Sequence, residues 1–266
     1  MPSAPSGRYE WFGWTVSAAS GVDIGLARLT ETHEHFHRHL DDTTAFGGLV
    51  TTIAALAEAQ PDQRWRRVHG QLVTQTDLLN ETFAVGASLL TTQRGLKIID
   101  GYPLYDRYVT ILERLLGSVH PWVALAGLRA AAMACMQSSA LELASVTGFG
   151  DFEPTQIPPL ERPNHRLSAL VQSHFDQEVA KAERVLERDH GAEPWWQRTA
   201  QVALPAESME GEAGALSETL QDRLFVCAAD FLRARGAQVL GHDAHHEQLR
   251  ALLAAASSQA SRGFGR

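Results

Sequence analysis

The pattern of hydrophobic and polar positions along the chain is mostly helical. Over long stretches apolar residues recur every three or four positions, the spacing that places them on one face of an α-helix. Strict alternation, which predicts strands, is scarce, and residues 201–204 are the one short candidate. The pattern therefore predicts a mainly α fold with little β structure.

Breaks rich in proline, glycine and aspartate divide this pattern into helices. The first predicted helix starts after Asp23, a candidate N-cap, and ends or kinks at 41–44. Further helices are predicted over residues 46–59, 64–92, 105–116, 122–146, 167–190, 216–235 and 244–256.

The remaining segments set the expected domain organisation. We expect a single domain over residues 1–266, with disorder at 1–8 and 257–266. The segment 148–165 contains four prolines and is predicted to link an N-terminal part to a C-terminal helical part.

The amino-acid composition and net charge indicate which kinds of partner and cellular location to expect. Of the 266 residues, 44% are hydrophobic and 20% are charged, and the net charge is −8. This acidic balance argues against a nucleic-acid or anionic-membrane partner. The sequence shows no secretory leader and no apolar run long enough to cross a bilayer, and Cys135 and Cys227 lie in apolar helical runs, as buried free thiols do. We therefore expect a cytoplasmic protein.

The first predicted helix carries a possible metal-binding motif, His33-Glu34-x-x-His37. Residues four apart lie one turn apart on the same face of a helix, so His33 and His37 can present two imidazoles to one cation. Glu34 lies about 100° further round the helix, within reach of a metal-bound water. This is the geometry of a zinc hydrolase.

The periodicity of the same helix separates its four histidines. Its apolar face has spacings of three and four residues and consists of Leu26, Leu29, His33, Phe36 and Leu40. His33 therefore lies on the apolar face with His37 beside it, whereas His35 and His39 lie on the other side. A buried face is where a metal site is expected, and where a solvated histidine is not.

Together with a later motif, Asn80-Glu81-x-x-Ala84, this pattern resembles the gluzincin-type zinc metallopeptidases. The resemblance covers residues 22–92 and implies that His33, His37 and Glu81 bind Zn²⁺ and that Glu34 is the general base. Glu81 also lies on a stripe of polar and small residues, where a carboxylate that faces the core needs a positive partner. Asp77, one turn earlier, is a candidate for orienting a ligand histidine.

The function implied by this resemblance is hydrolysis of an amide bond in a peptide or small amide by a zinc-activated water. An oxyanion-stabilising side chain is also expected. The candidates are Tyr102, Tyr105, Tyr108 and His120. Among them we select Tyr105.

One departure from the family concerns the fold. Gluzincins place a β-sheet before the metal-binding helix, but only 32 residues precede His33 and they do not have a strand pattern. We therefore expect a zincin-like metal-binding core that is largely helical.

Two other functions remain open at the level of sequence. Glu34-x-x-His37 and a second Glu187-x-x-His190 could belong to a di-iron helix bundle, with Glu81 and Glu142 as bridging carboxylates. The chain could instead be a non-catalytic helical interaction protein with a structural or vestigial zinc site. His69 or an additional aspartate is the natural fourth ligand of a structural site.

Overall fold

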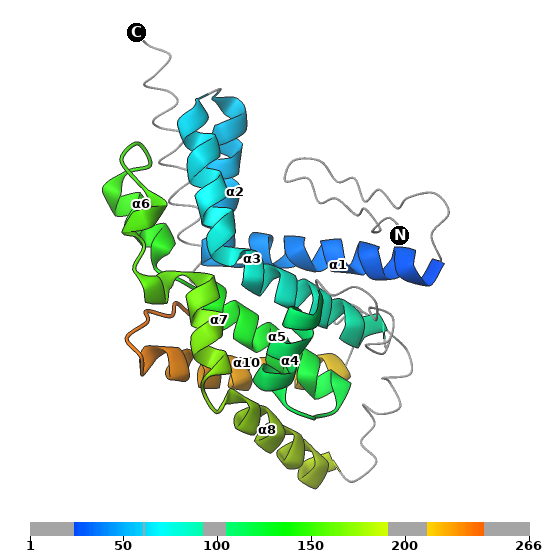
Figure 1. Ribbon diagram of the computed structural model, residues 1–266. Coiled ribbons are helices and arrows are strands. Elements are labelled where there is room, and N and C mark those ends of the chain that lie inside the picture. Colours follow the sequence, from blue (N-terminus) through cyan, green and yellow to red (C-terminus); the bar gives the residue numbers. More distant parts are fainter. Residues whose placement is uncertain (1–23, 61, 93–104, 191–211, 242–266) are drawn as a thin grey trace.

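The structure is a computed structural model that describes residues 24–60, 62–92, 105–190 and 212–241 (Figure 1). These residues are mainly helical, which confirms the predicted mainly α fold. They contain no strand, only an isolated bridge between Ser138 and Val239. The expectations for residues 1–8, 201–204, 244–256 and 257–266 lie outside the described residues.

The helices follow the predicted order. They are α1 (Ile24–Thr43), α2 (Ala45–Ala59), α3 (Gln63–Thr92), α4 (Asp106–Leu116), α5 (Pro121–Met136), α6 (Ala140–Thr147), α7 (Pro163–Val171), α8 (Phe175–His190) and α10 (Glu212–Arg233). Two short 3₁₀ helices, η3 (Pro154–Gln156) and η4 (Pro159–Glu161), precede α7.

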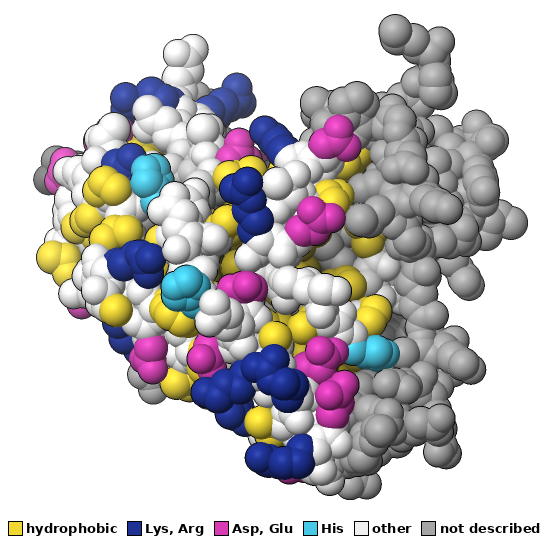
Figure 2. Space-filling model, turned by 60° about the horizontal axis from the view of Figure 1, so that its bottom comes forward, with side chains coloured by type: hydrophobic (Ala, Val, Ile, Leu, Met, Phe, Trp, Pro, Cys, Tyr) yellow, Lys and Arg dark blue, Asp and Glu magenta, His cyan; other side chains and the backbone are white. Residues whose placement is uncertain are grey.

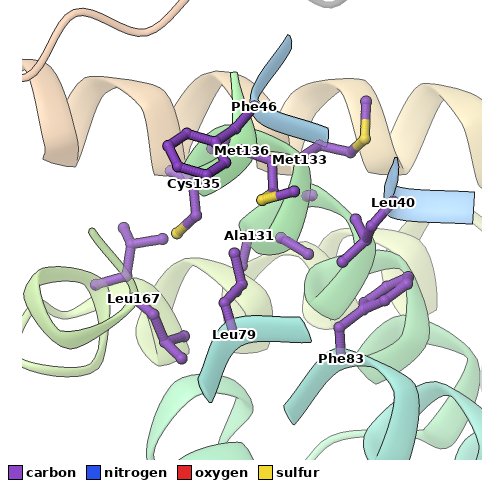
Figure 3. Packing of buried hydrophobic residues seen from close by; sticks show 14 of the residues in the cluster. Leu40, Phe46, Leu79, Phe83, Ala131, Met133, Cys135, Met136 and Leu167 are labelled. Atoms are coloured by element: carbon purple, nitrogen blue, oxygen red, sulfur yellow. The ribbon is translucent and has the colours of Figure 1, made fainter. Parts of the chain in front are cut away.

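The core is organised around α5, which is buried along almost its whole length. Its many alanines leave room for the neighbouring helices, and α3 and α10 both pack against it. Figure 3 shows side chains from α1, α2, α3, α5 and α7 meeting in this core. The labelled members are Leu40, Phe46, Leu79, Phe83, Ala131, Met133, Cys135, Met136 and Leu167.

A tight connection sets the path of α1 relative to α2. Only Thr44 separates the two helices, and its Oγ1 accepts a hydrogen bond from the backbone N–H of Gly47 while donating one to the carbonyl of Leu40. A Cβ atom at Gly47 would lie 2.5 Å from the Cα atom of Asp41. Glycine is therefore needed there so that α2 can begin beside the end of α1.

The sequence prediction of one helix over 122–146 is wrong, because the chain breaks between α5 and α6 at residues 137–139. A buried ion pair stabilises the break: Arg166 Nη2 lies 2.5 Å from Glu161 Oε2. Arg166 also donates to the carbonyl of Gln137, and Glu161 accepts from the backbone N–H of Ser139. Backbone groups that a continuous helix would have paired are satisfied by tertiary contacts instead.

The predicted helix over 167–190 is also divided. It consists of α7, which begins earlier at Pro163, and α8, which begins at Phe175. Ser173 lies in the turn between them, where its Oγ accepts a hydrogen bond from the backbone N–H of Phe175. A serine in this position stabilises a helix start, so the amphipathic pattern continues across the turn while the helix does not.

The segment 148–165, predicted as a linker, is packed against the body of the protein. Phe149, Phe152 and Ile157 are buried in the same hydrophobic cluster as the helices on both sides. Arg64 on α3 donates hydrogen bonds to the carbonyls of Phe149 and Phe152. Helices from both halves of the chain therefore share one core.

The surface carries charges of both signs. On the face shown in Figure 2, acidic and basic side chains are interspersed. In the described part of the chain, no single helix has both the length and the apolar character that a membrane span needs. Together, α4 and α5 have sufficient length and apolar composition, but the two helices are strongly bent relative to each other.

Candidate metal centre

The packing of α1 against α3 brings together the three side chains predicted as metal ligands. His33 and His37 lie one turn apart on α1, and their Nε2 atoms are 3.0 Å from each other. Glu81 reaches them from α3, with carboxylate oxygens 3.6 Å from His33 Nε2 and 3.5 Å from His37 Nε2. Among the described residues, these three form a group that could hold a metal ion.

The spacing of these atoms fits a small tetrahedral ion. Ligands about 2.0–2.1 Å from a tetrahedral zinc ion are roughly 3.3 Å from one another. The separations of 3.0, 3.5 and 3.6 Å within the cluster lie close to that value. Small side-chain movements would therefore be enough to coordinate the ion.

Asn80 orients one of the two histidines. Its Oδ1 atom lies 2.9 Å from Nδ1 of His37, and the contact is buried. An amide oxygen can only accept, so Nδ1 of His37 carries the proton and Nε2 presents a lone pair toward Glu81. Metal-binding histidines are commonly oriented in this way through their second ring nitrogen.

His33 is held neutral by its surroundings. Burial, and secondarily the neighbouring His37, lower the pKa of His33 to about 3, while a hydrogen bond to the backbone of Ala84 acts in the opposite direction. We assign that bond to Nδ1, because Nε2 faces His37 and Glu81. Two ring nitrogens 3.0 Å apart need a shared proton or a shared cation, and with a carboxylate beside both of them a cation satisfies all three groups.

Glu34, the predicted general base, is buried next to this cluster, with 8% of its surface exposed. Burial raises the pKa of its carboxyl, and the charge of Glu81 raises it further, whereas His37 lowers it. Glu34 is not among the three residues whose ligand atoms group together, although its charge interacts with those of His37 and Glu81. Its role as general base stays a prediction.

The candidates for oxyanion stabilisation have different surroundings. Tyr105 is half-buried, and its ring packs 6.2 Å from that of Tyr108 in a small apolar cluster at the start of α4. Tyr108 is buried, and its hydroxyl accepts a hydrogen bond from Arg107. His120 caps α5 by accepting a hydrogen bond from the backbone N–H of Trp122 through its Nδ1 atom. Tyr102 lies outside the described residues.

Two further expectations are not met. Asp77 does not orient a ligand histidine, because its Oδ1 accepts a hydrogen bond from Asn164 on α7. His69 is absent from the metal cluster, since the twelve residues that separate it from Glu81 on α3 correspond to about 18 Å of helix. The described residues therefore provide three ligands and not the four of a closed structural zinc site.

The second Glu-x-x-His motif does not join the cluster in the described part of the chain. Glu187 is exposed near the end of α8, and Glu142 is exposed on α6. In Figure 1, α6 lies at the upper left of the molecule and α8 at the bottom. The carboxylates that a di-iron site would need are therefore not assembled around His37.

Sequence reasoning missed the roles of two residues near the cluster. Asn80 was part of the motif shared with the gluzincins, but only the structure shows that it binds His37. Arg107 carried no motif at all, yet its guanidinium interacts electrostatically with Asp77 and Glu81. The orienting amide could have been inferred from its position next to Glu81, whereas nothing in the local sequence marks Arg107.

Comparisons with protein-family models, with curated proteins and with solved structures find no match for this chain. The resemblance to gluzincins therefore stays a prediction from two short sequence motifs.

Proposed function

We propose that this protein is a zinc-dependent hydrolase that cleaves an amide bond, with His33, His37 and Glu81 as the metal ligands. The observation that carries the proposal is the convergence of these three groups on one point, with Glu34 buried beside them. The three come from two helices, and Glu81 lies 48 positions after His33, so their meeting is a result of the fold.

The donor set favours zinc over other ions. Two imidazoles and one carboxylate are the ligands of many catalytic zinc sites, and three protein ligands leave a fourth position for water or substrate. Magnesium and calcium prefer sites built from oxygen atoms alone. When bound, the ion would supply Lewis-acid polarisation of the amide carbonyl and a water of lowered pKa.

Glu34 supplies the proton transfers of the proposed reaction. Its carboxylate takes a proton from the attacking water as the new C–O bond forms at the amide carbon. The same proton then passes to the amide nitrogen as the C–N bond breaks, which releases a carboxylic acid and an amine. Asn80 accepts a hydrogen bond from Nδ1 of His37 and would thereby keep the Nε2 lone pair of this histidine available to the metal.

Elemental analysis of the purified protein tests the metal centre. We expect one zinc per chain in the wild type and its loss in His33→Ala, His37→Ala and Glu81→Ala. His35→Ala is the matched control, because His35 is an exposed histidine of the same helix and should leave the zinc content unchanged. A zinc content that is unchanged in Glu81→Ala would remove the third ligand and with it the proposed hydrolase.

A further inference from the structure

Beside the metal cluster lies the first turn of α4. Tyr108 of this turn is buried in a small apolar cluster with Leu29, Val85 and Leu89. Leu29 precedes His33 by one turn of α1, and Val85 follows Glu81 by one turn of α3. The packing of Tyr108 therefore places the start of α4 next to the candidate ligands.

The neighbouring Arg107 is exposed but held in place. Its guanidinium carbon lies 4.5 Å from the centre of the Tyr108 ring, and the same group donates a hydrogen bond to the Tyr108 hydroxyl. A cation over an aromatic face is attracted by the ring electrons. Because the ring itself is buried, the charge has a defined position at the edge of the cluster.

The positive charge of Arg107 lies beside Tyr108, which packs close to the candidate ligands, and no carboxylate among the described residues is near enough to neutralise it. Arg107 interacts electrostatically with Asp77 and Glu81, but it makes no ion pair with any carboxylate that the structure describes. Asp77 is engaged with Asn164 instead, 2.7 Å away. Within the described residues, Tyr108 is the one hydrogen-bond acceptor of Arg107, so its other guanidinium N–H groups can bind an acceptor from outside this part of the chain.

The charges around the cluster favour an anion there. Two neutral imidazoles and the carboxylate of Glu81 would leave a cluster loaded with a divalent ion at a net charge of +1, and Arg107 adds a second positive charge nearby. Glu34 and Asp77 oppose this, although Asp77 is already hydrogen-bonded to Asn164. A planar guanidinium pairs best with a carboxylate, which it can bind through two parallel hydrogen bonds.

We propose that Arg107 binds a carboxylate of the substrate, so that the site prefers amides that carry a carboxylate near the bond to be cleaved. This rests on the proposed metal centre and adds the substrate class to it. Arg107 acts here as a specificity-determining residue.

Binding of small metal-directed probes to the cobalt-substituted protein tests this proposal without a turnover assay. The visible absorption of bound Co²⁺ reports each titration. Butyrohydroxamate and succinic monohydroxamate are a matched pair, because a carboxylate in the second replaces the terminal methyl group of the first. Further pairs of probes, lengthened by one and two methylene groups, place the carboxylate or the methyl group farther from the metal, so that the series tests longer distances to Arg107.

In the wild type we expect the carboxylate probe of at least one pair to bind roughly tenfold tighter than its neutral partner, as a charged hydrogen bond predicts. Arg107→Gln should reduce this ratio to about one while the neutral probe still binds. Arg114→Gln is the control, because Arg114 is an exposed arginine in the last turn of the same helix. It should keep the wild-type ratio.

Two results would overturn the proposal and leave the metal centre standing. One is equal binding of both members in every pair by the wild type, and the other is a preference that survives in Arg107→Gln. Absence of the cobalt absorption in the wild type would instead overturn the metal centre and the carboxylate site together.

Discussion

The Nδ1 atom of His37 on α1 and the Oδ1 atom of Asn80 on α3 lie 2.9 Å apart in a buried contact. This bond joins the two helices that form the candidate metal centre at the level of the ligands themselves. Because Glu81 follows Asn80 directly, the turn of α3 that orients one ligand also supplies another. A shift of α3 along α1 would therefore disturb both functions at once.

Replacing Asn80 tests this arrangement. Asn80→Leu keeps the approximate shape of the side chain but removes the acceptor, so we expect zinc affinity to fall by about 10- to 100-fold. Asn80→Asp retains an acceptor and should bind zinc at least as tightly as the wild type. Competition with a chromophoric chelator measures both affinities. Wild-type affinity in Asn80→Leu would show that the bond to His37 does not support the metal.

Replacing Glu34 separates metal binding from proton transfer. Glu34→Gln should keep one zinc per chain, because Glu34 is not among the grouped ligands, but it should lower amide hydrolysis by roughly 10²- to 10⁴-fold. Mass spectrometry of a mixture of short peptides incubated with the protein measures the cleavage. Glu31→Gln, which alters an exposed glutamate of the same helix, should behave as the wild type. Undiminished cleavage by Glu34→Gln would rule out Glu34 as the base.

Because α2 lies close to the end of α1 at Gly47, we expect a side chain at this position to lower the stability of the protein strongly. A methyl group at this position would lie 2.5–2.7 Å from backbone atoms of Asp41 and Leu40, which cannot move independently of the helix. We expect Gly47→Ala to lower the free energy of unfolding by at least about 2 kcal/mol. Urea denaturation measures it.

Gly70→Ala is the control for this prediction. Gly70 is an exposed position of α3 with no atom within 4 Å of an added Cβ. Alanine should stabilise the helix there by up to about 1 kcal/mol. If both alanine variants had similar stability, close packing would not be the reason for glycine at position 47.

The buried carboxyl of Asp41 predicts a pH dependence of stability. Burial, with a smaller contribution from the charge of Asp42, raises the pKa of Asp41 well above its ordinary value. In the unfolded chain this carboxyl loses its proton near pH 4, whereas in the folded protein it keeps it to higher pH. The unfolded state therefore binds fewer protons, and stability falls as the pH rises above about 4.

Asp41→Asn removes this titration. The variant should gain stability relative to the wild type as the pH increases, and the two proteins should converge toward pH 3. Urea denaturation across this pH range gives the comparison. Asp222→Asn, at an exposed position of α10, should show no such divergence. A constant difference between Asp41→Asn and the wild type at every pH would mean that folding does not raise the pKa of Asp41.

Much of the helical structure could be predicted because its causes are local. Periodic apolar positions and Pro- or Gly-containing breaks predicted α1 to α4 to within a few residues. The breaks near Gln137 and Ser173 could not be predicted in the same way, because neither contains a proline or a glycine. Near Gln137 the break depends on Arg166 and Glu161, which lie more than twenty residues further along the chain.

The sequence by itself determined that His33 and His37 share one face of a helix, because residues four apart are always one turn apart. It also indicated Glu81 as a candidate ligand through a short motif, but it did not determine the distance between Glu81 and the histidines. Only the tertiary structure decided that Glu81 meets them, that Asn80 rather than Asp77 orients His37, and that Arg107 lies nearby. Those relationships depend on how α1, α3 and α4 pack, which is governed by buried side chains spread along the chain and not by any local pattern.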